Sequence, residues 1–128
     1  MVNKDRHFFG RSFELQAVDF LIKRGFKILD RNFYIRGGEL DIVARKAKDI
    51  YFIEVRHRGK TSFASAFESI DQRKMRRIVK TAMVYVRKKQ LDRDNYDFHF
   101  AVMSVNEEGI DILWDAFTLQ DVGFYCSI

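Results

Sequence analysis

The chain has 128 residues, of which 47% are hydrophobic and 32% are charged, so it is too apolar for a disordered segment and has the length of one domain. Its single cysteine excludes an intrachain disulfide and a multi-cysteine zinc site. Its formal net charge of +5 is compatible with nucleic-acid binding as well as with a charged, solvated surface. No apolar run approaches the about 18 residues that cross a membrane, and the charged N-terminus lacks the apolar core of a signal peptide, so we expect a cytoplasmic protein.

The hydrophobic pattern divides the chain into a helix, three strands, a second helix and two further strands. This order predicts a single α/β domain over residues 1–128 with a mixed sheet, a core at about 10–118, a mobile N-terminus and a short C-terminal tail. The predicted elements, in chain order, are helix Arg11–Lys23, strand Phe26–Tyr34, strands Glu39–Arg45 and Ile50–Arg58, helix Ala66–Lys89, and strands Phe98–Val105 and Ile110–Trp114.

The second predicted helix is amphipathic. Its apolar residues recur at helical spacing, and its opposite side carries a run of basic residues that begins at Arg73 and ends at Lys89. A basic helix face attracts a phosphate backbone, and it is also typical of a solvated helix surface. Lys74 could supply an amine to a neighbouring site, although an exposed helix lysine is the more common interpretation.

The first hairpin carries the candidate chemistry. If its turn is centred on Ala47 and Lys48, facing residues have numbers that sum to 95, so Asp41 faces Glu54. Glu39 and Arg56 then face each other on the same side of the hairpin, because residues two apart on a strand share a face. Two facing carboxylates repel each other, and a divalent cation between them removes the repulsion.

Mg²⁺ suits this arrangement because it binds one or two carboxylates, keeps several waters and leaves room for a substrate phosphate. A solvent-facing ladder of charges, in which Glu39 pairs with Arg56, is the structural alternative. The apolar residues on both strands favour a largely buried sheet, in which carboxylates need partners or a metal. A register slip of one residue would put the two acids on opposite faces.

Two segments of this hairpin resemble a known family. Residues 38–44, Gly-Glu-Leu-Asp-Ile-Val-Ala, and residues 52–58, Phe-Ile-Glu-Val-Arg-His-Arg, are similar to the paired motifs of the YraN family. These small, largely uncharacterised bacterial proteins are assigned to the restriction-endonuclease-like PD-(D/E)XK superfamily. Flanking matches, among them residues 10–14 and 67–70, extend the resemblance over about residues 10–118. It implies a restriction-endonuclease-like core of order αβββαβ, with a mixed central sheet flanked by helices.

The resemblance also implies residue roles. Asp41 and Glu54 become metal ligands, the Val55 carbonyl is a further candidate, and Glu14 matches a helix glutamate that completes such sites in junction-resolving relatives. Arg56 stands where the family has a lysine. An arginine stays protonated and cannot act as a general base, but it can clamp a phosphate and stabilise negative charge.

We therefore expect a nuclease that depends on Mg²⁺ or Mn²⁺ and hydrolyses phosphodiester bonds of DNA, with branched and single-stranded forms as candidate substrates. Asp41, Glu54, Arg56 and Glu14 are its candidate catalytic residues. Arg58, Lys74 and Arg77 are the residues expected to contact nucleic acid. The alternative is a catalytically weak or inactive nucleic-acid-binding protein that retains the nuclease fold, and a third interpretation is a protein-interaction module in which the charged ladder is structural.

Overall fold

The computed structural model describes residues 2–57, 67–68 and 70–123, with side chains from residue 13 onward. Among these residues, no helix combines the length and apolarity that crossing a membrane requires. The elements are α1 (Val2–Lys23), β1 (Lys27–Ile35), β2 (Gly38–Lys46), β3 (Asp49–His57), α3 (Gln72–Lys88), β4 (Asp97–Asn106), β5 (Gly109–Phe117) and the short 3-10 helix η1 (Gln120–Val122).

The five strands form one sheet in the order β1-β2-β3-β4-β5. Neighbouring strands are antiparallel except β3 and β4, which run parallel and are connected through α3. A parallel pair requires a crossover connection, and a helix commonly provides it. The α/β class, the mixed sheet and the element order predicted from the sequence are confirmed, and they are consistent with a restriction-endonuclease-like αβββαβ core.

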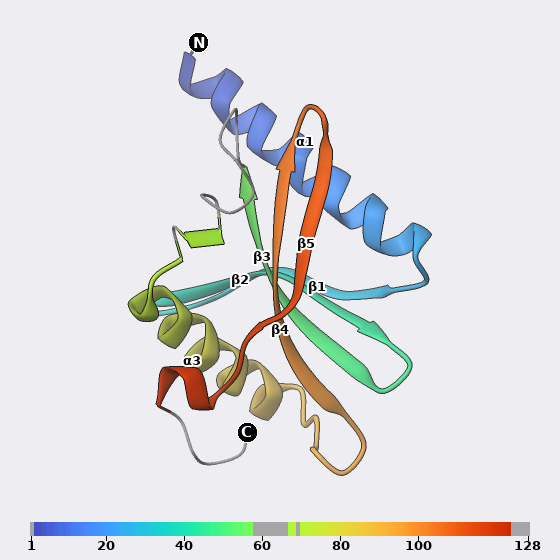
Figure 1. Ribbon diagram of the computed structural model, residues 1–128, viewed down its shortest axis with the longest axis vertical. Coiled ribbons are helices and arrows are strands. Elements are labelled where there is room, and N and C mark those ends of the chain that lie inside the picture. The colour runs from blue at the N-terminus through green and yellow to red at the C-terminus, as the bar shows by residue number, and fades with distance from the viewer. Residues whose placement is uncertain (1, 58–66, 69, 124–128) are drawn as a thin grey trace.

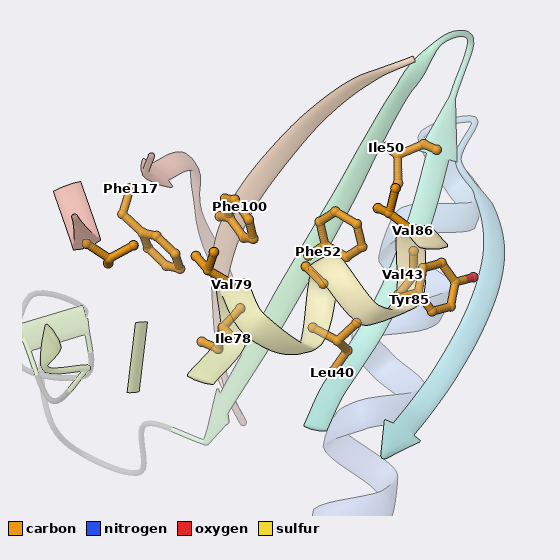
Figure 2. Close-up of a cluster of buried hydrophobic side chains, with 12 residues drawn as sticks. Leu40, Val43, Ile50, Phe52, Ile78, Val79, Tyr85, Val86, Phe100 and Phe117 are labelled. Atoms are coloured by element: carbon orange, nitrogen blue, oxygen red, sulfur yellow. The ribbon is translucent and has the colours of Figure 1, made fainter. Parts of the chain in front are cut away.

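The two helices cover opposite faces of the sheet (Figure 1). Between α3 and the sheet lies a cluster of buried side chains around Phe52, Tyr85 and Phe100 (Figure 2). A second cluster, which includes Leu21 and Ile53, lies on the α1 side. Successive residues of β3 alternate between the two clusters, as strand geometry requires, so Glu54 lies on the α3 side with Phe52.

Both helices differ from the predicted boundaries. The first begins at Val2, whereas the apolar pattern predicts Arg11. The second was predicted as one helix from Ala66, but α3 begins at Gln72 because the Asp71 side chain caps it and accepts a hydrogen bond from the Lys74 backbone N–H at 2.8 Å. This cap fixes the first turn of α3, from which the candidate site receives one of its side chains.

Candidate functional site

The register of the β2–β3 hairpin is the one predicted. Facing pairs run from Lys46 and Asp49 to Ile42 and Ile53, and each pair sums to 95. The ladder ends there, and just beyond it the Asp41 carboxylate accepts a hydrogen bond from the Val55 backbone N–H at 2.8 Å. A side chain therefore takes the acceptor role that a backbone carbonyl fills elsewhere in the ladder, and this contact directs the Asp41 carboxyl toward β3.

Asp41 and Glu54 converge at this point. Glu54 is buried, with 6% of its surface exposed, and its carboxyl lies close enough to Asp41 for its charge to act on that group. The pKa of Asp41 is raised to about 7, by burial first and by the negative charge of Glu54 second, and the hydrogen bond from the Val55 N–H partly opposes this rise. A position where a buried and a half-buried carboxyl meet favours an additional positive charge.

Two cations already lie against Glu54. Lys74 Nζ is 3.4 Å from Glu54 Oε1, and Arg56 Nε is 3.7 Å from the same oxygen. The Arg56 Nε atom is buried, and among the described residues it finds no hydrogen-bond acceptor. The sequence pattern favours an exposed helix lysine at position 74, but only 28% of its side chain is exposed, because it reaches from α3 to the buried Glu54. That interpretation of Lys74 is therefore wrong.

The Asp41–Glu54 pair fits a divalent cation. Both groups supply carboxylate oxygens, which are the ligands that Mg²⁺ prefers, and Mg²⁺ commonly uses one or two carboxylates with several waters. In the described part of the chain, no third acid, histidine or cysteine joins them in a metal-binding group. A metal held here would depend on these two carboxylates, with the Val55 carbonyl as the further ligand that the family resemblance implies.

Glu14 is engaged elsewhere. Its Oε1 accepts hydrogen bonds from the Arg31 guanidinium at 3.1 Å and from the Asn32 side-chain amide at 2.9 Å, which ties α1 to β1. Its carboxylate nevertheless lies near Tyr34, a residue that the charges of Glu39 and Asp41 also reach. The neighbouring Tyr34 has its pKa raised by the charge of Glu39 first, and by those of Glu14 and Asp41 as smaller contributions.

Lys74 and Arg77 line one cavity of about 510 Å³ beside the acids, hereafter the site cavity. Its other lining residues are Gly37, Gly38, Glu39 and Ile78. Arg58, which was also predicted to contact nucleic acid, lies outside the described residues. His57 stacks on Phe13 of α1 at a ring-centroid distance of 4.1 Å, so it packs on the other face of the sheet, as its strand alternation predicts.

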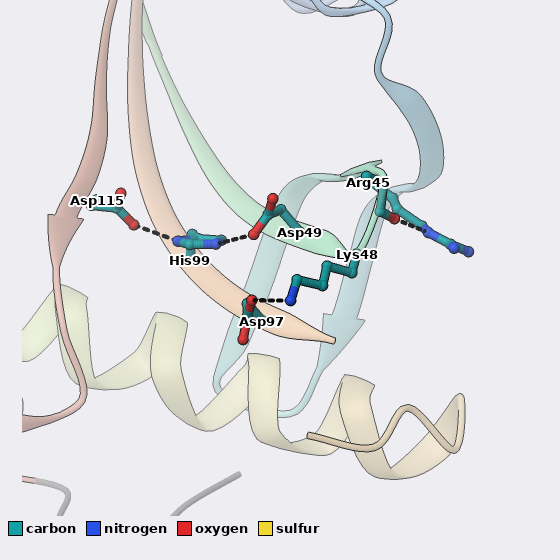
Figure 3. Close-up of polar contacts among 7 residues, drawn as sticks. Arg45, Lys48, Asp49, Asp97, His99 and Asp115 are labelled. Carbon is teal, nitrogen blue, oxygen red and sulfur yellow. Dashed lines mark hydrogen bonds and ion pairs between the residues drawn. The ribbon is translucent and has the colours of Figure 1, made fainter. Parts of the chain in front are cut away.

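His99 forms a polar cluster that the sequence pattern did not predict. Its Nδ1 lies 2.6 Å from Asp115 Oδ1 and its Nε2 lies 2.8 Å from Asp49 Oδ1, so one ring joins β3, β4 and β5 (Figure 3). Burial alone would lower the pKa of His99, but the two carboxylate hydrogen bonds outweigh it and raise the pKa. Asp49 starts β3 and Glu54 lies near its other end, so this cluster is separate from the acid pair.

Known proteins resemble this chain over most of its length. A family model described as "Uncharacterised protein family UPF0102" matches residues 13–113. A UPF0102 protein of Hahella chejuensis is 42% identical over 85% of this chain and 89% of its own. Relatives with the same family name from Fusobacterium nucleatum and Vibrio campbellii are 36% and 35% identical, over 90% and 82% of this chain and 95% and 86% of their own.

Proposed function

The chain belongs to the uncharacterised protein family UPF0102, which confirms the YraN-type resemblance, and on this premise we propose that it is a metal-dependent nuclease that hydrolyses phosphodiester bonds of DNA. The observation that carries this proposal is the convergence of Asp41 and Glu54 where β2 and β3 part. A buried glutamate beside a half-buried aspartate whose pKa is raised is expensive to maintain, and perturbed acids of this kind concentrate at functional sites.

In this proposal Asp41 and Glu54 hold Mg²⁺ together with the Val55 carbonyl. Bound there, Mg²⁺ supplies the Lewis-acid charge that hydrolysis of a phosphodiester requires. Glu14 does not ligate it, because its contacts with Arg31 and Asn32 assign it to holding α1 against β1.

Lys74 and Arg56 supply the remaining positive charge. Arg56 offers a buried N–H without an acceptor of its own, and a phosphate oxygen would satisfy it. Lys74 contributes the amine that the motif position itself lacks, since its Nζ approaches the same Glu54 oxygen from α3. Both groups lie where they can stabilise negative charge that develops on a phosphate. Neither needs to lose a proton for this role.

The test is cleavage of an end-labelled DNA panel that contains duplex, single-stranded and branched forms. We expect cutting with Mg²⁺ or Mn²⁺, none with EDTA, and a loss of at least about 100-fold in Asp41→Asn and in Glu54→Gln. The matched control is Asp19→Asn, because Asp19 is an exposed α1 acid that pairs only with Lys23 among the described residues. Binding of Mn²⁺, measured by calorimetry, should weaken in Asp41→Ala and not in the control.

Equal cutting by wild type and both site variants would identify a contaminating nuclease and refute the proposal. Unchanged Mn²⁺ affinity in Asp41→Ala would remove the metal site.

The arginine at position 56 favours a second candidate function, a nucleic-acid-binding protein with the nuclease fold and little activity. An Arg56→Lys variant separates the two. If this variant cuts DNA and the wild-type chain does not, the second function is correct. If both cut at similar rates, Lys74 is the more important amine, and Lys74→Gln should then lower the rate in both backgrounds.

A further inference from the structure

The first two turns of α3 carry positive charge that is not balanced locally. Arg73, Arg76, Arg77 and Lys80 follow the spacing i, i+3, i+4, i+7, which places them on one face of the helix. Within the described chain, none of the four forms an ion pair, and the first turn of α3 contains no acidic residue. Like charges at this spacing repel each other, so the stripe destabilises the free helix and would be relieved by an anion.

These four exposed side chains line an open cavity of about 520 Å³ together with Val122 and Gly123, and we call it the basic pocket. Its wall is η1, which lies beside α3 in Figure 1. Arg76 Nε donates a hydrogen bond to the Val122 carbonyl at 3.2 Å, and Gln72 donates to the Asp121 carbonyl at 3.2 Å. Gly123 then turns the chain in a left-handed conformation, with φ +84°.

The hydrogen bond from Nε fixes the Arg76 guanidinium and uses only one of its five N–H donors. In the described residues, the other donors of Arg76 have no protein acceptor, and the side chains of Arg73, Arg77 and Lys80 make no hydrogen bond. The pocket is therefore a cavity lined by several charged donors and by η1. Its donor set suits phosphate oxygens, which guanidinium groups bind in pairs.

Arg77 lines both the basic pocket and the site cavity. The site cavity also contains Lys74, whose Nζ lies 3.4 Å from Glu54 Oε1. A line of positive charge thus leads from the acid pair along α3 into the basic pocket. Because a helix rises 1.5 Å per residue, Lys80 lies about 9 Å further along the axis than Lys74. One strand of a duplex covers that distance in two or three nucleotides, because it presents one phosphate per about 3.4 Å of helix axis.

We propose that the basic pocket binds a backbone phosphate of the substrate strand, two or three nucleotides from the phosphate at the Asp41–Glu54 pair. This inference rests on the proposed function for the identity of the strand and adds a second anchoring point to it. A strand that is held at both points runs in one direction along α3. The pocket therefore determines on which side of the acid pair the longer part of the bound strand lies.

Binding of a fluorescent single-stranded oligonucleotide in EDTA tests the pocket. The variant Arg73→Gln/Lys80→Gln removes two charges from groups that make no hydrogen bond to the described protein, so we expect it to fold. The matched control, Arg87→Gln/Lys88→Gln, removes the same charge from the last turn of the same helix. We expect affinity to fall at least about 10-fold in the pocket variant and less than about two-fold in the control, with a shallower salt dependence only in the pocket variant.

Equal losses in both double variants would mean a diffuse electrostatic effect and would overturn the proposal, as would no loss in either. A neutral methylphosphonate linkage, moved along the oligonucleotide one position at a time, gives an independent readout. At one position it should weaken binding of the wild-type chain and leave the pocket variant unchanged. Equal weakening of both proteins at every position would overturn the inference. The inference would also be overturned if inorganic phosphate displaced the oligonucleotide at a concentration equal to that of the oligonucleotide's own phosphates. The pocket would then bind a free anion.

Because these measurements exclude metal and cleavage, they separate the two proposals. A pocket variant that binds weakly while the wild-type chain never cuts DNA removes the proposed function and keeps the pocket as a nucleic-acid site. Normal binding by the pocket variant, with metal-dependent cleavage intact, removes the pocket and keeps the nuclease.

Discussion

Substitution of Gly38 by alanine should separate α3 from the sheet. A Cβ at this position would lie 2.1 Å from Thr81 Oγ1, whereas ordinary contacts begin at 3.4 Å, so the gap must grow by more than 1 Å. The Thr81 side chain cannot easily turn away, because it is fully buried and its hydroxyl donates a hydrogen bond to the Arg77 carbonyl at 2.6 Å. Either the helix shifts or this buried hydrogen bond breaks.

Overpacking of this kind costs about 1–3 kcal/mol, and a contact this short belongs in the upper part of that range. We expect Gly38→Ala to lower the free energy of unfolding by about 2–3 kcal/mol. For a chain of this size, that change lowers the melting temperature by about 8–12 °C, at about 4 °C per kcal/mol. If the helix shifts, Lys74 and Arg77 move with it, and any DNA cleavage should then also decrease.

Chemical denaturation of a double-mutant cycle provides the assay. Thr81→Ala removes the clashing oxygen and leaves the new methyl 3.4 Å from the Arg77 carbonyl and 3.5 Å from the Thr81 Cβ. Gly38→Ala should therefore have little effect in the Thr81→Ala background, with a coupling energy of about 2 kcal/mol. Gly37→Ala is the control: its Cβ would contact nothing, but its φ of +89° strains any side chain, so its effect should not depend on Thr81. Additive effects of Gly38→Ala and Thr81→Ala would refute the reasoning.

Two further predictions concern stability. The raised pKa of His99 means that its bonds to Asp49 and Asp115 stabilise the fold fully below the unfolded-state pKa of about 6.5, and that this contribution is lost as pH rises through the folded-state pKa. We expect wild type to be more stable than His99→Asn by up to about 1 kcal/mol at pH 6, a small value because the three side chains are partly exposed. Denaturation curves should show that this difference shrinks between pH 6 and pH 9. A difference that stays constant or grows with pH would contradict the prediction. Asp71→Ala removes the hydrogen bond from the Lys74 N–H and should lower the free energy of unfolding by about 1 kcal/mol. Asp71→Asn keeps an acceptor at this position and should retain most of the stability. Equal losses in the two variants would show that the loss of stability does not come from the cap hydrogen bond.

The hairpin register could be predicted because strand geometry is local. A two-residue turn at Ala47 and Lys48 fixes every facing pair, and Ala47 adopts the left-handed conformation, with φ +54°, that such turns use. The start of α3 was harder to predict, because the buried Ile70 continues the apolar helical spacing across the break that Asp71 introduces. The signal in the sequence for a helix start at this point was Asp71, an N-cap residue type three residues before Lys74.

The acid pair was predicted, but its surroundings depend on packing between distant segments. A two-residue period gives the face of Asp41 and says nothing of the point at which β2 leaves β3, so the bond to Val55 could not be inferred. The contact between Lys74 and Glu54 depends on where α3 crosses the sheet, which local spacing does not determine. The link from His99 to Asp115 depends in the same way on the register of β4 and β5.

The parallel pairing of β3 with β4 has a consequence for how the chain is made. During synthesis, β1, β2 and β3 leave the ribosome first and can form a meander that already contains Asp41 and Glu54. The far edge of β3 then has no partner until residues 97–106 follow, and Phe52 lacks its neighbours Phe98 and Phe100 for as long. Unpaired apolar edges recruit other chains. We expect translation products that stop before β4 to aggregate or to be degraded, so the carboxylate pair reaches solution only within a finished molecule.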